Sequence, residues 1–189
     1  MLAVLTGIPG TGKTTVAKKA LEILRDDNVN YELVTYGDIM FDEAKCRGLV
    51  DDRDQMRKLD SKQQKEIQKE SAKKISEIGA EKSILVDTHC TIRTPRGYLP
   101  GLPQEVLNEL KPDVFILIEA GPEEIAVRRQ GDKTRQRDGE LTEEIRLHQE
   151  LNRDIAMAYS VFTGCTVKII ENPQGKIDEA AEEMALVLK

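Results

Sequence analysis

The sequence predicts an α/β fold in which helices cover both faces of a five-stranded parallel sheet. Two observations lead to this prediction. Short apolar segments alternate along the whole chain with longer segments of helical periodicity, and such alternation is typical of a parallel sheet with helices on its faces. A glycine-rich turn also joins the first apolar segment directly to the first helical one, which is a common strand-to-helix connection in such folds.

The expected strands are rich in Val, Ile, Leu, Tyr and Thr, which suit strands buried on both faces. They are Leu2–Thr6, Tyr31–Tyr36, Ser83–Asp87, Val114–Ile118 and Thr166–Ile170. Periodicity predicts helices over Gly12–Asp26, Asp38–Arg47, Ser61–Glu81, Leu102–Leu110, Pro122–Gln130, Thr142–Phe162 and Lys176–Leu188, with Ser61 and Thr142 as N-caps. Two polar stretches, Asp51–Lys74 and Gly131–Glu140, are expected to be surface inserts on a single domain spanning residues 1–189.

Composition and charge exclude several classes of protein. The chain has 28 Lys and Arg against 34 Asp and Glu, a net charge of −6, so we expect no nucleic-acid partner. It has no run of about 18 apolar residues and no signal-peptide pattern in MLAVLTG, so we expect a mature sequence without a membrane partner. The cysteines, Cys46, Cys90 and Cys165, are odd in number and far apart, which indicates a cytoplasmic protein without disulfides or structural zinc.

The first strand is followed by GIPGTGKT, which matches the phosphate-binding pattern G-x-x-x-x-G-K-S/T. Glycines let successive backbone N–H groups face phosphate oxygens, and the next helix adds its N-terminal dipole. We expect Lys13 to reach the β- and γ-phosphates and Thr14 to ligate Mg²⁺. The expected ATP-binding residues are Gly7, Ile8, Pro9, Gly10, Thr11, Gly12, Lys13, Thr14 and Thr15, with Thr15 at the α-phosphate. The alternative is a tight glycine-rich turn that binds nothing.

Asp87 ends the apolar segment Ile84–Asp87, where a second metal-binding group belongs in such proteins. An acid at the end of a strand next to the phosphate loop can hold Mg²⁺ together with the threonine hydroxyl. The alternative is an aspartate that caps or turns the chain after the strand. Thr14 and Asp87 are therefore the expected metal ligands.

Arginines gather in three places outside the expected core. Transfer of a phosphoryl group between two nucleotides brings two polyanions together, and several guanidinium groups are needed to neutralise them. The three clusters are Arg53 and Arg57, Arg93 and Arg96, and Arg128, Arg129, Arg135 and Arg137. Arg25, Arg47, Arg146 and Arg153 lie among acidic residues of helical segments and are interpreted as solvated helix faces.

With these motifs the chain resembles the adenylate kinases of the archaeal type, within the P-loop nucleoside monophosphate kinases. The resemblance rests on GIPGTGKTT, DDRDQMRKL, DTHCTIRTPRGYLPGLP, RRQGDKTRQRD and TVKII, in this order over nearly the whole chain. It implies a three-layer P-loop NTPase fold with a monophosphate-binding flap at about 38–74 and a short lid at about 130–140. It also implies reversible, Mg²⁺-dependent phosphoryl transfer from ATP to AMP, giving two ADP.

The resemblance assigns roles to single residues. It places Arg57 and Arg93 on the phosphate of AMP. The base-reading residues of common relatives do not map cleanly onto this chain, so the candidates for the acceptor base are Gly37, Asp38 and Met40, at the end of the second strand. His89 either reaches that phosphate or fixes its own loop. The residues expected to act on the transferring group are Lys13, Arg93 and the lid arginines Arg129, Arg135 and Arg137.

The chain also departs from common bacterial relatives. It has DTHCTIR where they carry D-G-F-P-R, and its short lid contains no cysteine, so no structural zinc is expected there. Two further functions stay open: a kinase of the same fold that acts on another monophosphate or a small hydroxyl compound, and an ATP-hydrolysing switch. The number of arginines favours transfer, because a switch needs a single arginine finger.

The helix expected over Thr142–Phe162 has more than one apolar side. One stripe contains Leu141, Ile145, His148, Asn152, Ile155 and Tyr159, and a second contains Leu147, Leu151, Ala158 and Phe162. One stripe can cover the sheet, whereas the second must meet either another part of the core or another subunit. The resemblance implies the second choice and predicts a homotrimer.

Overall fold

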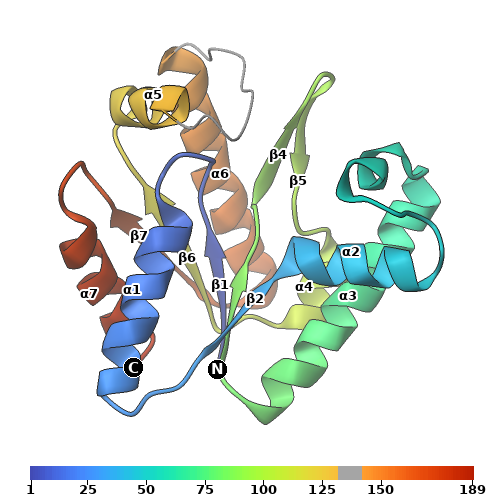
Figure 1. Cartoon of the computed structure of the whole chain (residues 1–189), viewed down its shortest axis with the longest axis horizontal. Helices are drawn as coiled ribbons and strands as arrows, with labels where there is room; N and C mark the ends of the chain where they lie inside the picture. Colours follow the sequence, from blue (N-terminus) through green and yellow to red (C-terminus); the bar gives the residue numbers. More distant parts are fainter. Residues whose placement is uncertain (132–141) are drawn as a thin grey trace.

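A five-stranded parallel sheet forms the centre of the computed structural model, which describes residues 1–131 and 142–189 (Figure 1). Its strands follow the order β2-β3-β1-β6-β7. Their bounds are β1 (Leu2–Thr6), β2 (Glu32–Thr35), β3 (Ile84–Asp87), β6 (Val114–Glu119) and β7 (Thr166–Glu171). The predicted fold class and its five strands are confirmed.

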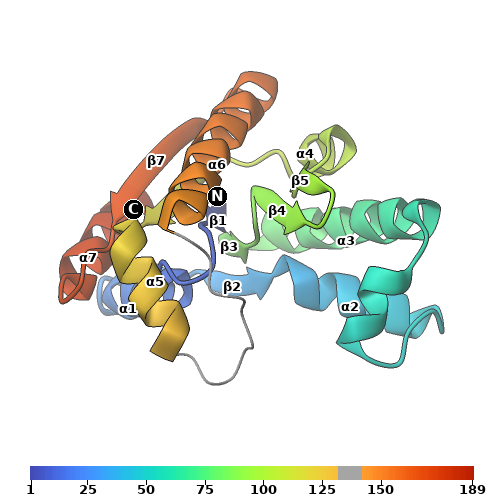
Figure 2. The ribbon, with the colours of Figure 1, turned by 90° about the horizontal axis from the view of Figure 1, so that it is seen from above.

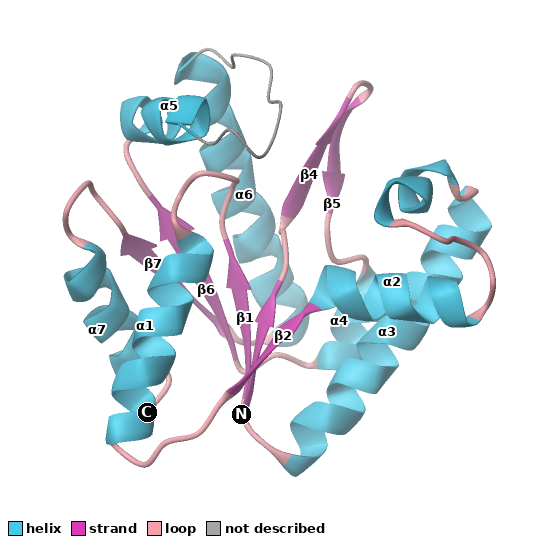
Figure 3. Ribbon diagram, in the orientation of Figure 1, coloured by secondary structure: helices cyan, strands magenta, loops and turns pink. Residues whose placement is uncertain are grey.

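Helices form a layer on each face of the sheet (Figures 2 and 3). The helices α1 (Lys13–Asp26) and α7 (Ile177–Val187) pack on one face, and α3 (Ser61–Glu81), α4 (Gln104–Leu110) and α6 (Thr142–Thr163) pack on the other. The helix α5 (Pro122–Gly131) follows β6, and α2 (Tyr36–Cys46) follows β2. Within the described ranges no helix combines the length and apolar character needed to cross a membrane.

The central strand β1 is buried on both sides, and its residues alternate between two apolar clusters. Leu2 and Val4 belong to the cluster under α3, α4 and α6, whereas Ala3 and Leu5 belong to the cluster under α1 and α7. β1 pairs with β3 on one side and β6 on the other. The end of β1 therefore emerges at the middle of the carboxyl edge, where parallel α/β sheets bind ligands.

A two-stranded antiparallel hairpin, β4 (Thr91–Thr94) and β5 (Gly97–Pro100), stands apart from the main sheet and was not expected from the sequence. Each strand has only four residues, and most of them are not buried, so the apolar alternation that reveals a strand is weak here. β4 packs against α6. This contact determines where Arg93, which lies in β4, is held.

The first polar insert contains a short helix besides the one predicted to begin at Ser61. It contains a 3₁₀ helix, η1 (Arg53–Lys58), and the first part of α3. Ala44, Val50 and Ile67 are buried in a small apolar cluster of this region. Met40 packs against this cluster and also against the sheet. The stretch Asp51–Lys74 lies mostly at the surface, as expected, but its Ile67 side chain is buried against α2.

Two expectations about α6 also change. Arg153 was interpreted as part of a solvated face, but its guanidinium donates from Nε to both carboxylate oxygens of the buried Glu119, at 2.8 and 3.0 Å. Thr142, expected as the N-cap, is the first helical residue. The ion pair joins α6 to the end of β6, so Arg153 has a structural partner in the fold.

The N-cap of α3 is Asp60 rather than Ser61. The Asp60 carboxylate accepts hydrogen bonds from the backbone N–H groups of Lys62 and Gln63 at 2.9 and 2.8 Å, and the Gln63 side chain accepts from the Asp60 N–H at 3.3 Å. This reciprocal capping box satisfies helix donors that would otherwise lack partners.

We expect Asp60→Ala to lower the free energy of unfolding by about 1 kcal/mol, because it removes this cap. Ser61→Ala is the control, since Ser61 is the first helical residue and alanine suits that position. Urea unfolding followed by circular dichroism measures both variants. A larger loss from Ser61→Ala than from Asp60→Ala would contradict the assignment.

Candidate active site

The glycine-rich loop connects β1 to α1 at the carboxyl edge of the sheet. Gly10 and Gly12 adopt positive φ angles of 95° and 84°, which glycine tolerates better than other residues. A Cβ atom on Gly12 would also lie only 2.5 Å from the side-chain nitrogen of Asn172. Gly12 is the N-cap of α1 and offers no side chain to its first turn. The first amide groups of α1 are therefore available to an anion.

Lys13 connects this loop to the turn after β3. Its Nζ donates to the Thr88 carbonyl at 2.7 Å and forms an ion pair with Asp87. The two side chains are 11% and 15% exposed. Burial lowers the pKa of Lys13, and the neighbouring Asp87 carboxylate opposes this shift. The loop therefore carries an ammonium group that is largely removed from solvent and held by two partners.

Thr14 and Asp87 fit a magnesium site that is completed by nucleotide phosphates. Thr14 is exposed in the first turn of α1, and Asp87 ends β3, next to β1. Both offer oxygen atoms, which Mg²⁺ prefers, and Mg²⁺ commonly takes only one or two protein ligands beside phosphates and water. Residues 1–131 and 142–189 contain no group of three or more His, Cys, Asp or Glu side chains that could hold a metal alone.

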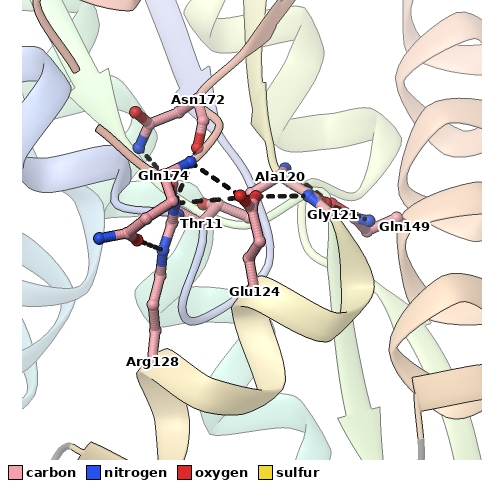
Figure 4. Close-up of polar contacts among 8 residues, drawn as sticks. All are labelled: Thr11, Ala120, Gly121, Glu124, Arg128, Gln149, Asn172 and Gln174. Carbon is pink, nitrogen blue, oxygen red and sulfur yellow. Dashed lines mark hydrogen bonds and ion pairs between the residues drawn. The ribbon is translucent and has the colours of Figure 1, made fainter. Parts of the chain in front are cut away.

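Side chains from outside the loop bind its carbonyl groups (Figure 4). Arg128 donates to the Thr11 carbonyl at 3.3 Å, and the Asn172 side chain donates to the same oxygen at 2.8 Å. Arg129 donates from Nε to the Pro9 carbonyl at 2.8 Å. Asn172 was not among the residues predicted from the sequence, although a polar residue directly after a strand is a recognisable signal for this edge of the sheet.

Two side chains hold the start of α5: the carboxylate of Glu124 and the carboxamide of Gln149. Both are drawn in Figure 4. Glu124 accepts hydrogen bonds from the backbone N–H groups of Gln174 and Gly121 at 2.8 and 3.2 Å. Both hydrogen bonds lower the pKa of Glu124, and the one from Gln174 has the larger effect. Gln149 of α6 donates to the Ala120 carbonyl at 3.0 Å. The helix that carries Arg128 and Arg129 is therefore anchored to both β6 and β7.

Arg93 and Arg129 come from distant segments, and the charge of each acts on the ring of His148. Arg93 forms an ion pair with Glu144 of α6 at 3.2 Å. Burial is the main cause that lowers the pKa of His148, and Arg129 and Arg93 both contribute. Arg93 lies in β4 and Arg129 in α5, and both are among the four arginines expected at the transferring phosphate. The other two, Arg135 and Arg137, lie outside the described residues.

His89 lies beside the phosphate loop. As a residue it is exposed, but its ring is crowded by protein atoms, and this desolvation, followed by the charge of Lys13, lowers its pKa to about 4. A hydrogen bond with the Gly7 backbone acts in the opposite direction. His89 is therefore neutral at physiological pH and next to the loop, a placement compatible with either of its expected roles.

The candidates for the acceptor base lie together in the first helical turns of α2, which follows β2 directly. Asp38 forms an ion pair with Arg53, and Met40 is half-buried. Gly37, directly before Asp38, is exposed. α2 begins directly after Thr35 of β2, and Thr35 pairs with Asp87 of the neighbouring strand β3. Arg57 belongs to η1, and its side chain is not described.

The fold and this loop define the chain as a P-loop protein of the kinase type. A family model described as "AAA domain" matches residues 6–146. Shikimate kinase from Acinetobacter baumannii in complex with shikimate aligns over 99% of this chain and 92% of its own, with a TM-score of 0.58 and 16% identity. Shikimate kinase from Bacteroides thetaiotaomicron aligns over 100% and 98%, with a TM-score of 0.57 and 14% identity. At these identities the likeness concerns the fold alone.

Sequence comparison identifies the family within this class. The chain is 52% identical to the adenylate kinase of Methanocaldococcus jannaschii, over 100% of this chain and 98% of the relative. It is 52% identical to that of Methanothermobacter thermautotrophicus, over 100% and 99%, and 49% identical to that of Methanococcus aeolicus, over 100% and 97%. The chain belongs to the adenylate kinase family, and the resemblance found in its sequence is confirmed.

The lowered pKa of His89 predicts a pH dependence of stability. The unfolded chain binds a proton at this residue near pH 6.5, whereas the folded chain does so only near pH 4, so stability falls as the pH is lowered through this window. When the pH is lowered from about 7 to about 4.5, we expect the melting temperature of His89→Asn to fall less than that of the unmodified chain. Calorimetry at several pH values measures this difference. Parallel melting-temperature curves would refute it.

Proposed function

We propose that the chain catalyses reversible phosphoryl transfer from Mg-ATP to AMP, giving two ADP. The observation that carries the proposal is Lys13, which is largely shielded from solvent and held between the phosphate loop and Asp87 at the carboxyl edge of the sheet. Identities near 50% to archaeal adenylate kinases over the whole chain support the substrates. The family is a family of phosphotransferases, so the reaction class follows from membership.

The donor side of the proposed reaction uses the loop from Gly7 to Thr15. Its amide groups bind the phosphates of ATP, and Lys13 neutralises charge on the β- and γ-phosphates. Thr14 and Asp87 would hold Mg²⁺, which neutralises phosphate charge when bound. Because the family's transfer depends on alignment and electrostatic stabilisation, none of the chain's side chains has to act as a general base.

The acceptor side uses arginines from three segments. We assign the phosphate of AMP to Arg57 and Arg93, the acceptor base to Gly37, Asp38 and Met40, and closure of the site to a flap at 38–74 and a lid at 130–140. Arg129, Arg135 and Arg137 then contact the transferring phosphoryl group with Lys13. The two closing segments exclude water, so that the phosphoryl group reaches AMP rather than being hydrolysed.

Product analysis with several acceptors tests the proposal. ATP and Mg²⁺ are supplied with AMP, GMP, CMP, UMP or shikimate, and the products are separated by ion-exchange chromatography. We expect rapid ADP formation with AMP and little without an acceptor. Preference for another acceptor would identify a different kinase, and ADP formation that ignores every acceptor would favour an ATP-hydrolysing switch.

Lys13→Met tests the donor site. We expect the rate of ADP formation to fall by about 10²-fold or more, because the lost ammonium stabilises charge during transfer. The fold should survive with a lower melting temperature, since Asp87 loses its ion-pair partner. Circular dichroism and a coupled ADP assay measure the two effects. Lys18→Met is the matched control, because Lys18 is exposed on the same helix. A Lys13→Met variant with near-normal turnover would remove Lys13 from the reaction.

We also propose that the chain assembles as a homotrimer through the apolar face of α6. The stripe containing Ile145, His148 and Tyr159 is buried within the chain. Phe162 of the second stripe is 64% exposed, and the neighbouring Val161 is 82% exposed. The full set of large exposed apolar side chains on this helix is Leu147, Met157, Val161 and Phe162. A face of this kind on one helix favours association with further copies.

Light scattering during size-exclusion chromatography tests the assembly. We expect a mass near three times 21.2 kDa, and we expect Val161→Asp to lower it, because the substitution buries a charge in the interface. Val127→Asp is the control, since Val127 is exposed on α5. A monomeric mass for the unmodified chain at micromolar concentration would exclude the trimer.

A cytoplasmic location is part of the same proposal. Cys46, Cys90 and Cys165 are all free thiols in the structure, and burial raises the pKa of Cys90 to about 12, which makes that thiol unreactive. Three unpaired cysteines suit a reducing compartment.

A further inference from the structure

Three buried polar side chains join the hairpin to α6. Thr91 of β4 is 5% exposed, and His148 and Asn152 of α6 are 5% and 3% exposed. The Thr91 hydroxyl donates to Asn152 Oδ1 at 3.1 Å, and His148 Nε2 lies 3.0 Å from the same hydroxyl oxygen. Because the Thr91 hydroxyl donates its only proton to Asn152, the hydroxyl oxygen accepts a hydrogen bond from His148 Nε2–H. The Thr91 hydroxyl is therefore held on both sides by one helix.

Further contacts along α6 hold both ends of the hairpin region. At its start, Glu144 pairs with Arg93. Near its end, the Tyr159 hydroxyl donates to the Cys90 carbonyl and accepts from the Leu102 N–H, both at 3.0 Å. Residues three, four or seven positions apart share one face of a helix. Glu144, His148, Asn152 and Tyr159 follow one another at intervals of four, four and seven positions. One face of α6 therefore contacts β4 and the residues that flank the hairpin.

The position of Thr91 matters because Arg93 is two residues further along the same strand. Side chains two positions apart in a strand point to the same face, and both Thr91 and Arg93 do contact α6. Apolar side chains at this interface could pack in more than one register. Directional hydrogen bonds between buried groups are costly to leave unmade, so they favour one register of the strand against the helix.

We propose that Thr91 and His148 are positioning residues that hold the Arg93 guanidinium in place for the acceptor phosphate. The inference rests on the proposed function, in which Arg93 binds the phosphate of AMP. α6 directly follows the proposed lid in the sequence, and the hairpin carries the arginine of the acceptor site. The hydrogen bonds between α6 and the hairpin therefore keep Arg93 at a fixed position along α6.

Steady-state kinetics with Thr91→Val and Thr91→Ser tests the proposal. Valine keeps the shape of threonine and removes the hydroxyl, whereas serine keeps the hydroxyl. We expect Thr91→Val to raise KM for AMP about tenfold and to leave KM for ATP within about twofold, because displacement of a binding group weakens only the ligand that it contacts. Thr91→Ser should keep KM for AMP within about twofold of the unmodified value.

Ser160→Ala is the matched control. It removes a hydroxyl that donates to the Cys165 carbonyl near the other end of α6, so it reports the effect of a lost hydrogen bond on this helix away from Arg93. A purely structural role for Thr91 predicts equal effects of Thr91→Val and Ser160→Ala on the two KM values. Equal effects, or an unchanged KM for AMP in Thr91→Val, would overturn the proposal.

A double-mutant cycle shows whether Thr91 acts through Arg93. In an Arg93→Ala background, Thr91→Val should change kcat/KM for AMP by less than about twofold, since the positioned group is already absent. If the double variant instead shows the full product of the losses in kcat/KM of the two single variants, the inference is overturned. If Thr91→Val does not fold, His148→Leu is compared with His148→Gln, and only the leucine variant should raise KM for AMP. Failure of the unmodified chain to form ADP from ATP and AMP would instead reject the proposed function.

Discussion

The buried contact of Lys13 with Asp87 and the Thr88 carbonyl is the interaction on which the site depends. It requires β1 and β3 to be neighbours in the register that pairs Leu5 with Asp87. Removing an ammonium and a carboxylate from water costs several kcal/mol for each ion, and mutual pairing and hydrogen bonding offset this cost. In the proposed reaction a phosphate group replaces Asp87 as the partner of this ammonium, which the sheet holds beside the loop.

The loop's own carbonyl groups explain why so many side chains converge on it from outside. Arg129 binds the carbonyl of Pro9, and Arg128 and Asn172 bind that of Thr11. In a planar trans peptide the N–H of the next residue points opposite to the carbonyl. When these carbonyls are held outward, the following amide groups, those of Gly10 and Gly12, are directed to the other side. External donors therefore help to orient the amide groups that bind phosphate.

The region assigned to the flap has an apolar cluster separate from the two that cover the sheet. Ala44, Val50 and Ile67 form its buried part, and Met40 lies at the boundary with the sheet-side cluster. A segment with its own core can change its position relative to the sheet while its internal packing is kept. This arrangement agrees with the proposed closure over AMP. The hydrogen bonds between α6 and the hairpin lie outside this region.

Local patterns in the sequence were enough to predict the five strands, most helices and the phosphate loop. Continuous apolar runs, helical periodicity and glycine spacing depend on neighbouring residues, so they can be recognised without a structure. The capping box of Asp60 and Gln63 is also local, and it was missed although its signal is present. The ends of parallel strands further predicted that Asp87 lies beside the loop.

Only the tertiary structure decided which distant side chains meet. Thr91 and His148 are 57 positions apart, and Thr11 and Asn172 are 161 apart. The partner of Arg153 and the existence of the short hairpin likewise depend on how α6 packs against β6 and β4. The physical reason is that a hydrogen bond between buried groups is set by the packing of whole elements, whereas periodicity and turn chemistry are set by residues a few positions away.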